Sequence, residues 1–171
     1  MLELLASEYR GLAQDILAII LIAIAFRWGG GPERVVAATW LVLFEVASVA
    51  SRAIWGSERQ LSDVDVFFAS TDILACVIWV AVALCANRTY TLWIAAMQLL
   101  AVTAHLARGL VEAISPVAYL TMVYVPGWFQ LMVLAIGLAR HINRKRRYGE
   151  YRDWRVGVPD RFVPVLGRGP G

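Results

Sequence analysis

The sequence predicts an all-helical protein that crosses a membrane five times. Hydrophobic residues make up 60% of its 171 residues and charged residues only 17%, whereas soluble domains are roughly 45–50% apolar. The apolar residues gather in five runs, each close to the ~20 residues that a helix needs to cross ~30 Å of hydrocarbon. We place the spans at residues 11–26, 35–55, 66–86, 91–113 and 117–139.

The first two spans are separated by a glycine-rich turn. The first is short and carries Gln14 and Asp15, and the apolar residues between positions 2 and 12 extend it outward. The turn at 27–34 contains three consecutive glycines but lacks the Lys-Ser/Thr pair of a phosphate-binding loop. The second span then follows at residue 35.

The remaining three spans have recognisable boundaries. Ser62 and Asp65 have the spacing of a helix N-terminal cap before the third span, and Pro116 suits the first position of the fifth. The connections at 87–89 and 114–116 are so short that we expect the third, fourth and fifth spans to be antiparallel neighbours. The five spans should therefore form an antiparallel bundle with short loops.

Proline and glycine mark the middle of the fifth span. Pro126 is followed directly by Gly127, and a proline inside a helix removes one backbone hydrogen bond and clashes with the preceding turn. We predict a kink or local unwinding here, with Gln130 or Tyr124 hydrogen-bonding to the freed backbone.

The arginines predict the orientation. The chain has fifteen arginines and one lysine, and a basic juxtamembrane segment at 140–155 follows the fifth span. The positive-inside rule puts this segment in the cytoplasm and the N-terminus outside an inner, or plasma, membrane. An extended Pro/Gly tail at 156–171 completes the chain. We expect anionic lipid headgroups to be contacted by Arg144, Lys145, Arg146 and Arg147.

Ionisable residues on four spans converge on the half of the membrane away from the C-terminus. A charge in hydrocarbon costs about 2.5–3.5 kcal/mol on insertion scales, so such groups pair with one another or line a polar cavity. On the fourth span they share one helical stripe, because they recur at intervals of three, four and seven residues. The predicted intramembrane polar cluster consists of Asp15, Glu45, Arg52, Asp72, Gln98, His105, Arg108 and Glu112.

Three functions fit such a cluster, beside purely structural pairing of the helices. Its four acids outnumber its two arginines, which favours a non-enzymatic subunit whose polar face is completed by another membrane subunit or by a homo-oligomer. The alternative is a small proton- or cation-linked carrier or channel, with Glu45, Asp72, His105 and Glu112 as relay groups. A weaker alternative is a membrane enzyme acting on lipid, with His105 as general base.

Other classes of site are not expected. The two histidines, His105 and His141, belong to opposite membrane faces, and Cys76 and Cys85 fall on opposite sides of one helix. The sequence therefore predicts no metal site and no cofactor. It identifies no catalytic residue, and no recognition fold indicates nucleic-acid binding.

Overall fold

The computed structural model describes residues 2–55, 66–110, 116–149 and 152–155. Within these ranges the secondary structure is helical, apart from one isolated bridge between Ala86 and Trp154. The described residues contain five helical spans that are long and apolar enough to cross a membrane. The all-helical prediction is therefore confirmed for the described residues, and the helices indicate a multi-pass membrane protein.

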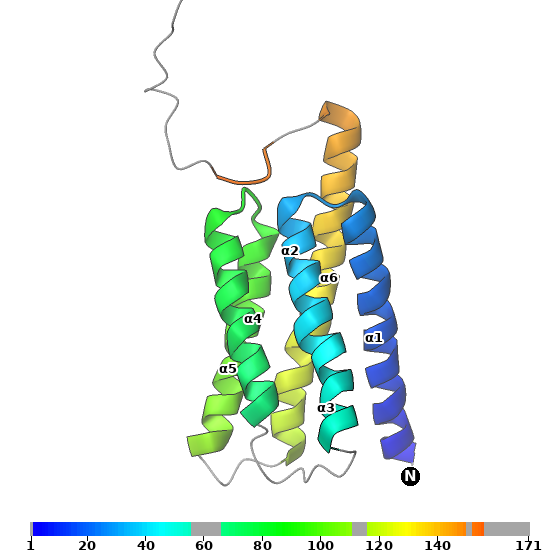
Figure 1. The fold of residues 1–171 in the computed structure, drawn as a ribbon, viewed down its shortest axis with the longest axis vertical. Helices are drawn as coiled ribbons and strands as arrows, with labels where there is room; N and C mark the ends of the chain where they lie inside the picture. The colour runs from blue at the N-terminus through cyan, green and yellow to red at the C-terminus, as the bar shows by residue number, and fades with distance from the viewer. Residues whose placement is uncertain (1, 56–65, 111–115, 150–151, 156–171) are drawn as a thin grey trace, which may run out of the picture.

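The spans lie side by side and successive ones run in opposite directions (Figure 1). Helix α6 packs along both α5 and α1, and α5 packs along α4. We call the end at which α1 stops and α2 starts the tail end, because the C-terminal segment also leaves α6 there. The helices are α1 (Leu2–Trp28), α2 (Gly31–Trp40), η1 (Leu41–Val46), α3 (Ala47–Trp55), α4 (Val66–Cys85), α5 (Tyr90–Leu110) and α6 (Pro116–Tyr148).

Two prolines stand where helices begin. Pro32 lies in the first turn of α2 and Pro116 is the first residue of α6. The absent N–H of a proline costs nothing in a first turn, where the backbone donors have no partner within the helix. The second span therefore starts at residue 31 rather than 35. The predicted cap at Ser62 and Asp65 lies outside the described residues.

Helix α6 differs from its prediction in two ways. It runs on to Tyr148, so most of the predicted juxtamembrane segment continues the helix instead of starting a new element. It also remains helical through Pro126 and Gly127, so the helix is continuous there rather than locally unwound. The alternative outcome, a kink at these two residues, stays a prediction. Gln130 bonds to a side chain of α5, as described below, rather than to the freed backbone.

The second span contains a π-helical turn that the sequence did not predict. Residues 41–46 form the π-helix η1, and the N–H of Ala47 bonds to the carbonyl of Val42, five residues back. Such wide turns occur within α-helices and frequently mark functional sites. The ring of Phe44 on this turn lies 5.1 Å from that of Trp40 and 6.0 Å from that of Trp79.

The core is a seam of small and aromatic side chains. Trp79 is fully buried and stacks on Trp40 with 5.8 Å between ring centroids. At Gly137 of α6, an added Cβ would lie 2.9 Å from the ring of Tyr90 on α5. The glycine therefore lets these two helices approach closely. Large apolar side chains such as Leu99 and Met132 are exposed, as expected of surfaces that face lipid.

Candidate functional site

Three helices contribute buried polar side chains to one hydrogen-bonded network inside the bundle. His105 Nε2 lies 2.6 Å from Asp72 Oδ2, and Gln98 Nε2 donates to Asp72 Oδ1 at 2.7 Å. Gln130 Nε2 donates to Gln98 Oε1 at 2.8 Å. All four residues are at most 6% exposed. We call this set the Asp72 network.

Helix geometry explains how the Asp72 network is assembled. Gln98 and His105 are seven residues apart on α5, which is close to two full turns, so both face α4. Asp72 lies about 9 Å along α4 from its first residue, Val66, at 1.5 Å per residue. Gln130 reaches the same place from α6, which packs on the neighbouring side of α5. The residues therefore meet where three helices adjoin.

The donors of the Asp72 network all point toward the carboxylate. Gln130 donates to Gln98, and Gln98 donates to both the side chain and the backbone carbonyl of Asp72. A carboxylate accepts but does not donate, so this direction of the hydrogen bonds provides Asp72 with the donors that it needs. Together with the imidazole of His105, the carboxylate forms a buried pair of titratable groups.

The other residues of the predicted polar cluster have different positions. Asp15, Glu45 and Arg108 are half-buried, on α1, η1 and α5, and each has an interaction partner. The side chain of Arg52 and the whole of Glu112 lie outside what the structure describes. The hydrogen bonds of the Asp72 network thus join three predicted residues, Asp72, Gln98 and His105, and add Gln130.

The two residues of the predicted kink lie close to this region of α6. Pro126 is buried, one helical turn before Gln130. At Gly127, an added Cβ would lie 2.6 Å from Gln14 Nε2 of α1. The glycine thus allows a polar side chain of the first span to lie against α6.

A second polar network lies at the tail end, and the sequence did not predict it. The guanidinium of Arg88, in the loop between α4 and α5, contacts Glu33 Oε1 at 3.2 Å and Asp153 Oδ1 at 2.6 Å. Its Nη2 also lies 3.2 Å from His141 Nδ1. Glu33 is fully buried, and its Oε2 has no hydrogen-bond partner among the described residues. We call these four residues the Arg88 network.

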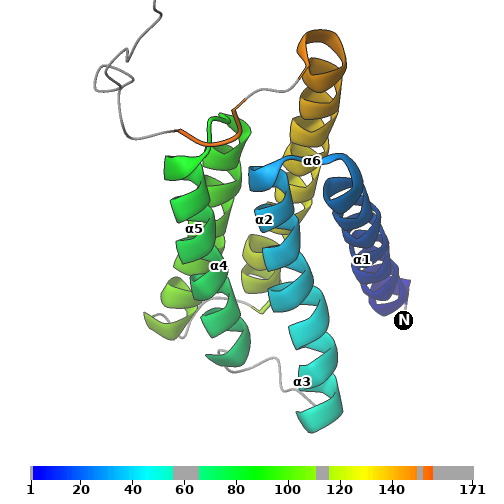
Figure 2. The same ribbon diagram turned by 45° about the horizontal axis from the view of Figure 1, so that its top comes forward.

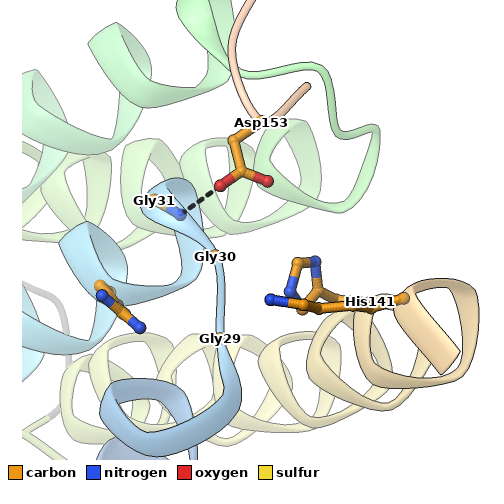
Figure 3. Close-up of a pocket in the computed structure, with 7 residues that line it drawn as sticks. Gly29, Gly30, Gly31, His141 and Asp153 are labelled. Carbon is orange, nitrogen blue, oxygen red and sulfur yellow. Dashed lines mark hydrogen bonds between the residues drawn. The ribbon is translucent and has the colours of Figure 1, made fainter. Parts of the chain in front are cut away.

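The Arg88 network fastens the C-terminal segment to the bundle. The N–H of Asn87 donates to the carbonyl of Asp153 at 3.0 Å, and the N–H of Arg155 donates to that of Cys85 at 2.7 Å. Besides its contact with Arg88, the Asp153 carboxylate accepts a hydrogen bond from the N–H of Gly31 at 2.8 Å (Figure 3). Residues 152–155 therefore lie across the loop between α4 and α5 (Figure 1).

The predicted lipid-contacting residues occupy the end of α6. All four of them, from Arg144 to Arg147, are exposed in its last turns, beyond the tail end of the other helices (Figures 1 and 2). Contact with anionic headgroups remains a prediction for these side chains. Lys145 also lines a cavity beside the Arg88 network.

In the described part of the chain, no group of three histidine, cysteine, aspartate or glutamate side chains has a geometry that holds a metal ion. Comparisons with models of protein families, with curated proteins and with solved structures found no match.

Proposed function

We propose that this protein is a small proton-linked membrane carrier or channel in which Asp72 and His105 exchange a proton. In this proposal the five spans form an antiparallel bundle in the inner membrane, with the N-terminus outside and the basic C-terminal segment in the cytoplasm. The Asp72 network then lies toward the external half of the bilayer.

The observation that supports the proposal is the contact between Asp72 Oδ2 and His105 Nε2, 2.6 Å apart and both buried. Histidine is the side chain whose ordinary titration falls between about pH 5 and 8. An ionisable pair at membrane depth is a functional-site hypothesis by default, because its insertion is costly. The proton moves between a carboxylate and an imidazole that are already in hydrogen-bonding contact.

Gln98 and Gln130 have the supporting role in this proposal. Neither amide titrates, but both hold the carboxylate in a fixed position and orient their donors toward it. Such orientation limits the rearrangement that accompanies each proton transfer. The hydroxyl groups of Ser70 and Thr71 bond instead within their own helix, to the carbonyls of Phe67 and Phe68.

The second candidate is a non-enzymatic subunit or assembly partner, and one feature favours it. Helix α3 continues directly from η1, has few contacts with the other described helices, and projects from the bundle in Figure 2. Its exposed Ala50 and Ala53 are small enough to let a helix of another chain approach. The excess of acidic residues in the predicted polar cluster also favours a partner, but Asp72 contacts His105 within the same chain. We therefore rank this candidate second.

Proton flux into liposomes tests the leading proposal. The purified protein is reconstituted with a pH-sensitive dye inside, and a potassium diffusion potential drives protons inward. We expect faster acidification than in protein-free liposomes. Asp72→Asn and His105→Gln should both abolish the increase, because each removes one of the two titratable groups.

Ser70→Ala is the matched control, since Ser70 is exposed on the same helix and its hydroxyl donates to the carbonyl of Phe67, three residues earlier. It should retain the wild-type flux. Flux that persists in both Asp72→Asn and His105→Gln contradicts the proposal. Native mass spectrometry of protein extracted from its own membrane separately tests the second candidate, because a partner chain at fixed stoichiometry would favour it.

A further inference from the structure

The described part of the C-terminal segment, residues 152–155, covers part of the tail end of the bundle. We call these four residues the strap. The strap lies across the loop between α4 and α5 (Figure 1), and its backbone bonds there to Cys85 and Asn87. Its Asp153 contacts Arg88, which in turn contacts the fully buried Glu33. The strap therefore helps to cover a buried ion pair.

Two consecutive glycines give the strap a specific position. An added Cβ at Gly30 would lie 2.7 Å from both carboxylate oxygens of Asp153, and one at Gly31 would lie 2.6 Å from Nε1 of Trp154. The N–H of Gly31 donates to Asp153 Oδ2 at 2.8 Å, at a helix start that has no side-chain cap of its own. The turn before α2 thus fits the strap because it has no side chains at these two positions.

The strap is attached by polar contacts rather than by buried apolar area. Three of its four residues are exposed, including Trp154 at 38%, and Asp153 is half-buried. Its described hydrogen bonds join it to the loop between α4 and α5 and to the first turn of α2. Segments with few buried apolar contacts and solvent-exposed backbone hydrogen bonds open locally, at a lower free energy than global unfolding.

The charges around Arg88 also favour a reversible release of the strap. In the closed state Arg88 contacts two carboxylates, those of Glu33 and Asp153. When the strap leaves, the Asp153 carboxylate enters water and Arg88 keeps Glu33 as its buried partner. Opening therefore strands no buried charge, whereas removal of Arg88 itself would.

We propose that the strap is a detachable lid, which closes the tail end through Asp153 and opens as one unit to expose Arg88 and Glu33 to the solution. A polar cavity of about 200 Å³ already lies beside the strap, and Asp153 forms part of its lining. Release of Asp153 removes one wall of this cavity. The inference does not depend on proton exchange at Asp72, because its test measures opening of the strap and not proton flux.

Hydrogen exchange of individual backbone amides measures this opening directly. Nuclear magnetic resonance of the full-length ¹⁵N-labelled protein in detergent resolves the N–H groups of Gly31, Asn87 and Arg155, whose bonds all join the strap to the bundle. We expect these three amides to share one protection factor, because their bonds break in a single opening event. It should be lower than the protection factors of Ile94 and Leu134, which are buried in α5 and α6.

A variant of Asp153 tests whether its carboxylate closes the lid. Asp153→Asn should lower the protection of the three strap-bonded amides about tenfold, the loss expected for one charge-assisted contact. Arg152→Gln is the matched control, since it changes the charge of an exposed neighbour within the strap, and it should change protection less than twofold. Ile94 and Leu134 should keep their protection in both variants, because the bundle stays folded.

A thiol reporter tests whether opening exposes the covered surface. Ala86 is fully buried and forms a backbone bridge with Trp154, so Ala86→Cys places a thiol under the strap. In a background with Cys76→Ala and Cys85→Ala, its labelling by a water-soluble maleimide should become about tenfold faster when Asp153→Asn is added. Arg146→Cys, at an exposed position of α6, should be labelled at the same rate with and without Asp153→Asn.

Several results would overturn the proposal. Strap-bonded amides as protected as Ile94 and Leu134 would show that the strap leaves only when the bundle unfolds. Unprotected amides in the wild-type protein would show that the lid is not closed. Equal effects of Asp153→Asn and Arg152→Gln on protection, or labelling of Ala86→Cys that does not respond to Asp153→Asn, would show that Asp153 does not control access to this surface.

Discussion

Replacing Arg88 by glutamine should destabilise the protein more than any surface change at the tail end. Arg88 contacts Glu33 Oε1 at 3.2 Å, whereas the other basic group near that oxygen among the described residues, His141 Nδ1, lies 4.0 Å away. Glu33 is fully buried and already has one oxygen without a hydrogen-bond partner among the described residues. Removing one member of a buried ion pair costs about 3–5 kcal/mol, because the other charge stays behind uncompensated. The variant also frees Asp153 and the C-terminal segment.

Thermal unfolding in one detergent at one heating rate measures this effect. For a domain of this size, 1 kcal/mol corresponds to roughly 2–4 °C, so the apparent Tm of Arg88→Gln should fall by roughly 6–20 °C. Adding Glu33→Gln to Arg88→Gln should restore much of the loss, because it removes the stranded charge. The control is Arg34→Gln, an exposed arginine next to Glu33. Equal Tm values for Arg88→Gln and Arg34→Gln would refute the reasoning, as would a double variant less stable than the sum of its single changes.

The packing makes three further predictions, each measured by the same thermal unfolding. Trp79→Ala should cost about 3–5 kcal/mol, because Trp79 is fully buried against Trp40; a cost under 1 kcal/mol would mean that the aromatic stack contributes little. Gly137→Ala should cost about 1–3 kcal/mol, because its Cβ would lie 2.9 Å from the Tyr90 ring; an unchanged Tm would mean that Tyr90 moves freely. Gln98→Leu should cost about 1–2 kcal/mol, the upper range for hydrogen bonds between membrane helices; a more stable variant would show that its bonds serve function alone.

The helical spans were predictable because a membrane imposes one simple requirement on sequence. Each span needs an apolar run of fixed length, and hydropathy reports that run directly. The ends were less predictable, since Pro32 starts a helix rather than ending a turn and α6 continues through basic residues as far as Tyr148. The π-helix at 41–46 has no characteristic residue pattern that hydropathy could report, and its Phe44 ring contacts Trp40.

The two polar networks show why one site was predictable and the other was not. Gln98 and His105 are polar residues that lie two helical turns apart within one apolar span, so the sequence alone identifies them as unusual. Gln130 was predicted to bond to the backbone near Pro126, which is close to it in sequence. No sequence pattern connects Gln130 with Gln98 on another span, so their hydrogen bond could not be predicted. The Arg88 network is drawn from four separate segments, and charged residues in loops are ordinary. The sequence feature that could have indicated this network is the short loop that places Arg88 beside the end of a span. Its two acidic partners, Glu33 and Asp153, lie in other segments near the ends of spans or beyond them.

The most direct test of the central claim is to observe the proton at His105. The chain has only two histidines, so nuclear magnetic resonance of protein labelled with ¹⁵N-histidine in bilayers gives two ring systems, and His141→Gln identifies them. We predict that the ring-nitrogen signals of His105 report its hydrogen bond to the Asp72 carboxylate and shift when Asp72→Asn replaces that carboxylate, whereas Ser70→Ala leaves them unchanged. A His105 ring whose signals are identical with and without the Asp72 carboxylate would contradict the claim that the two side chains exchange a proton.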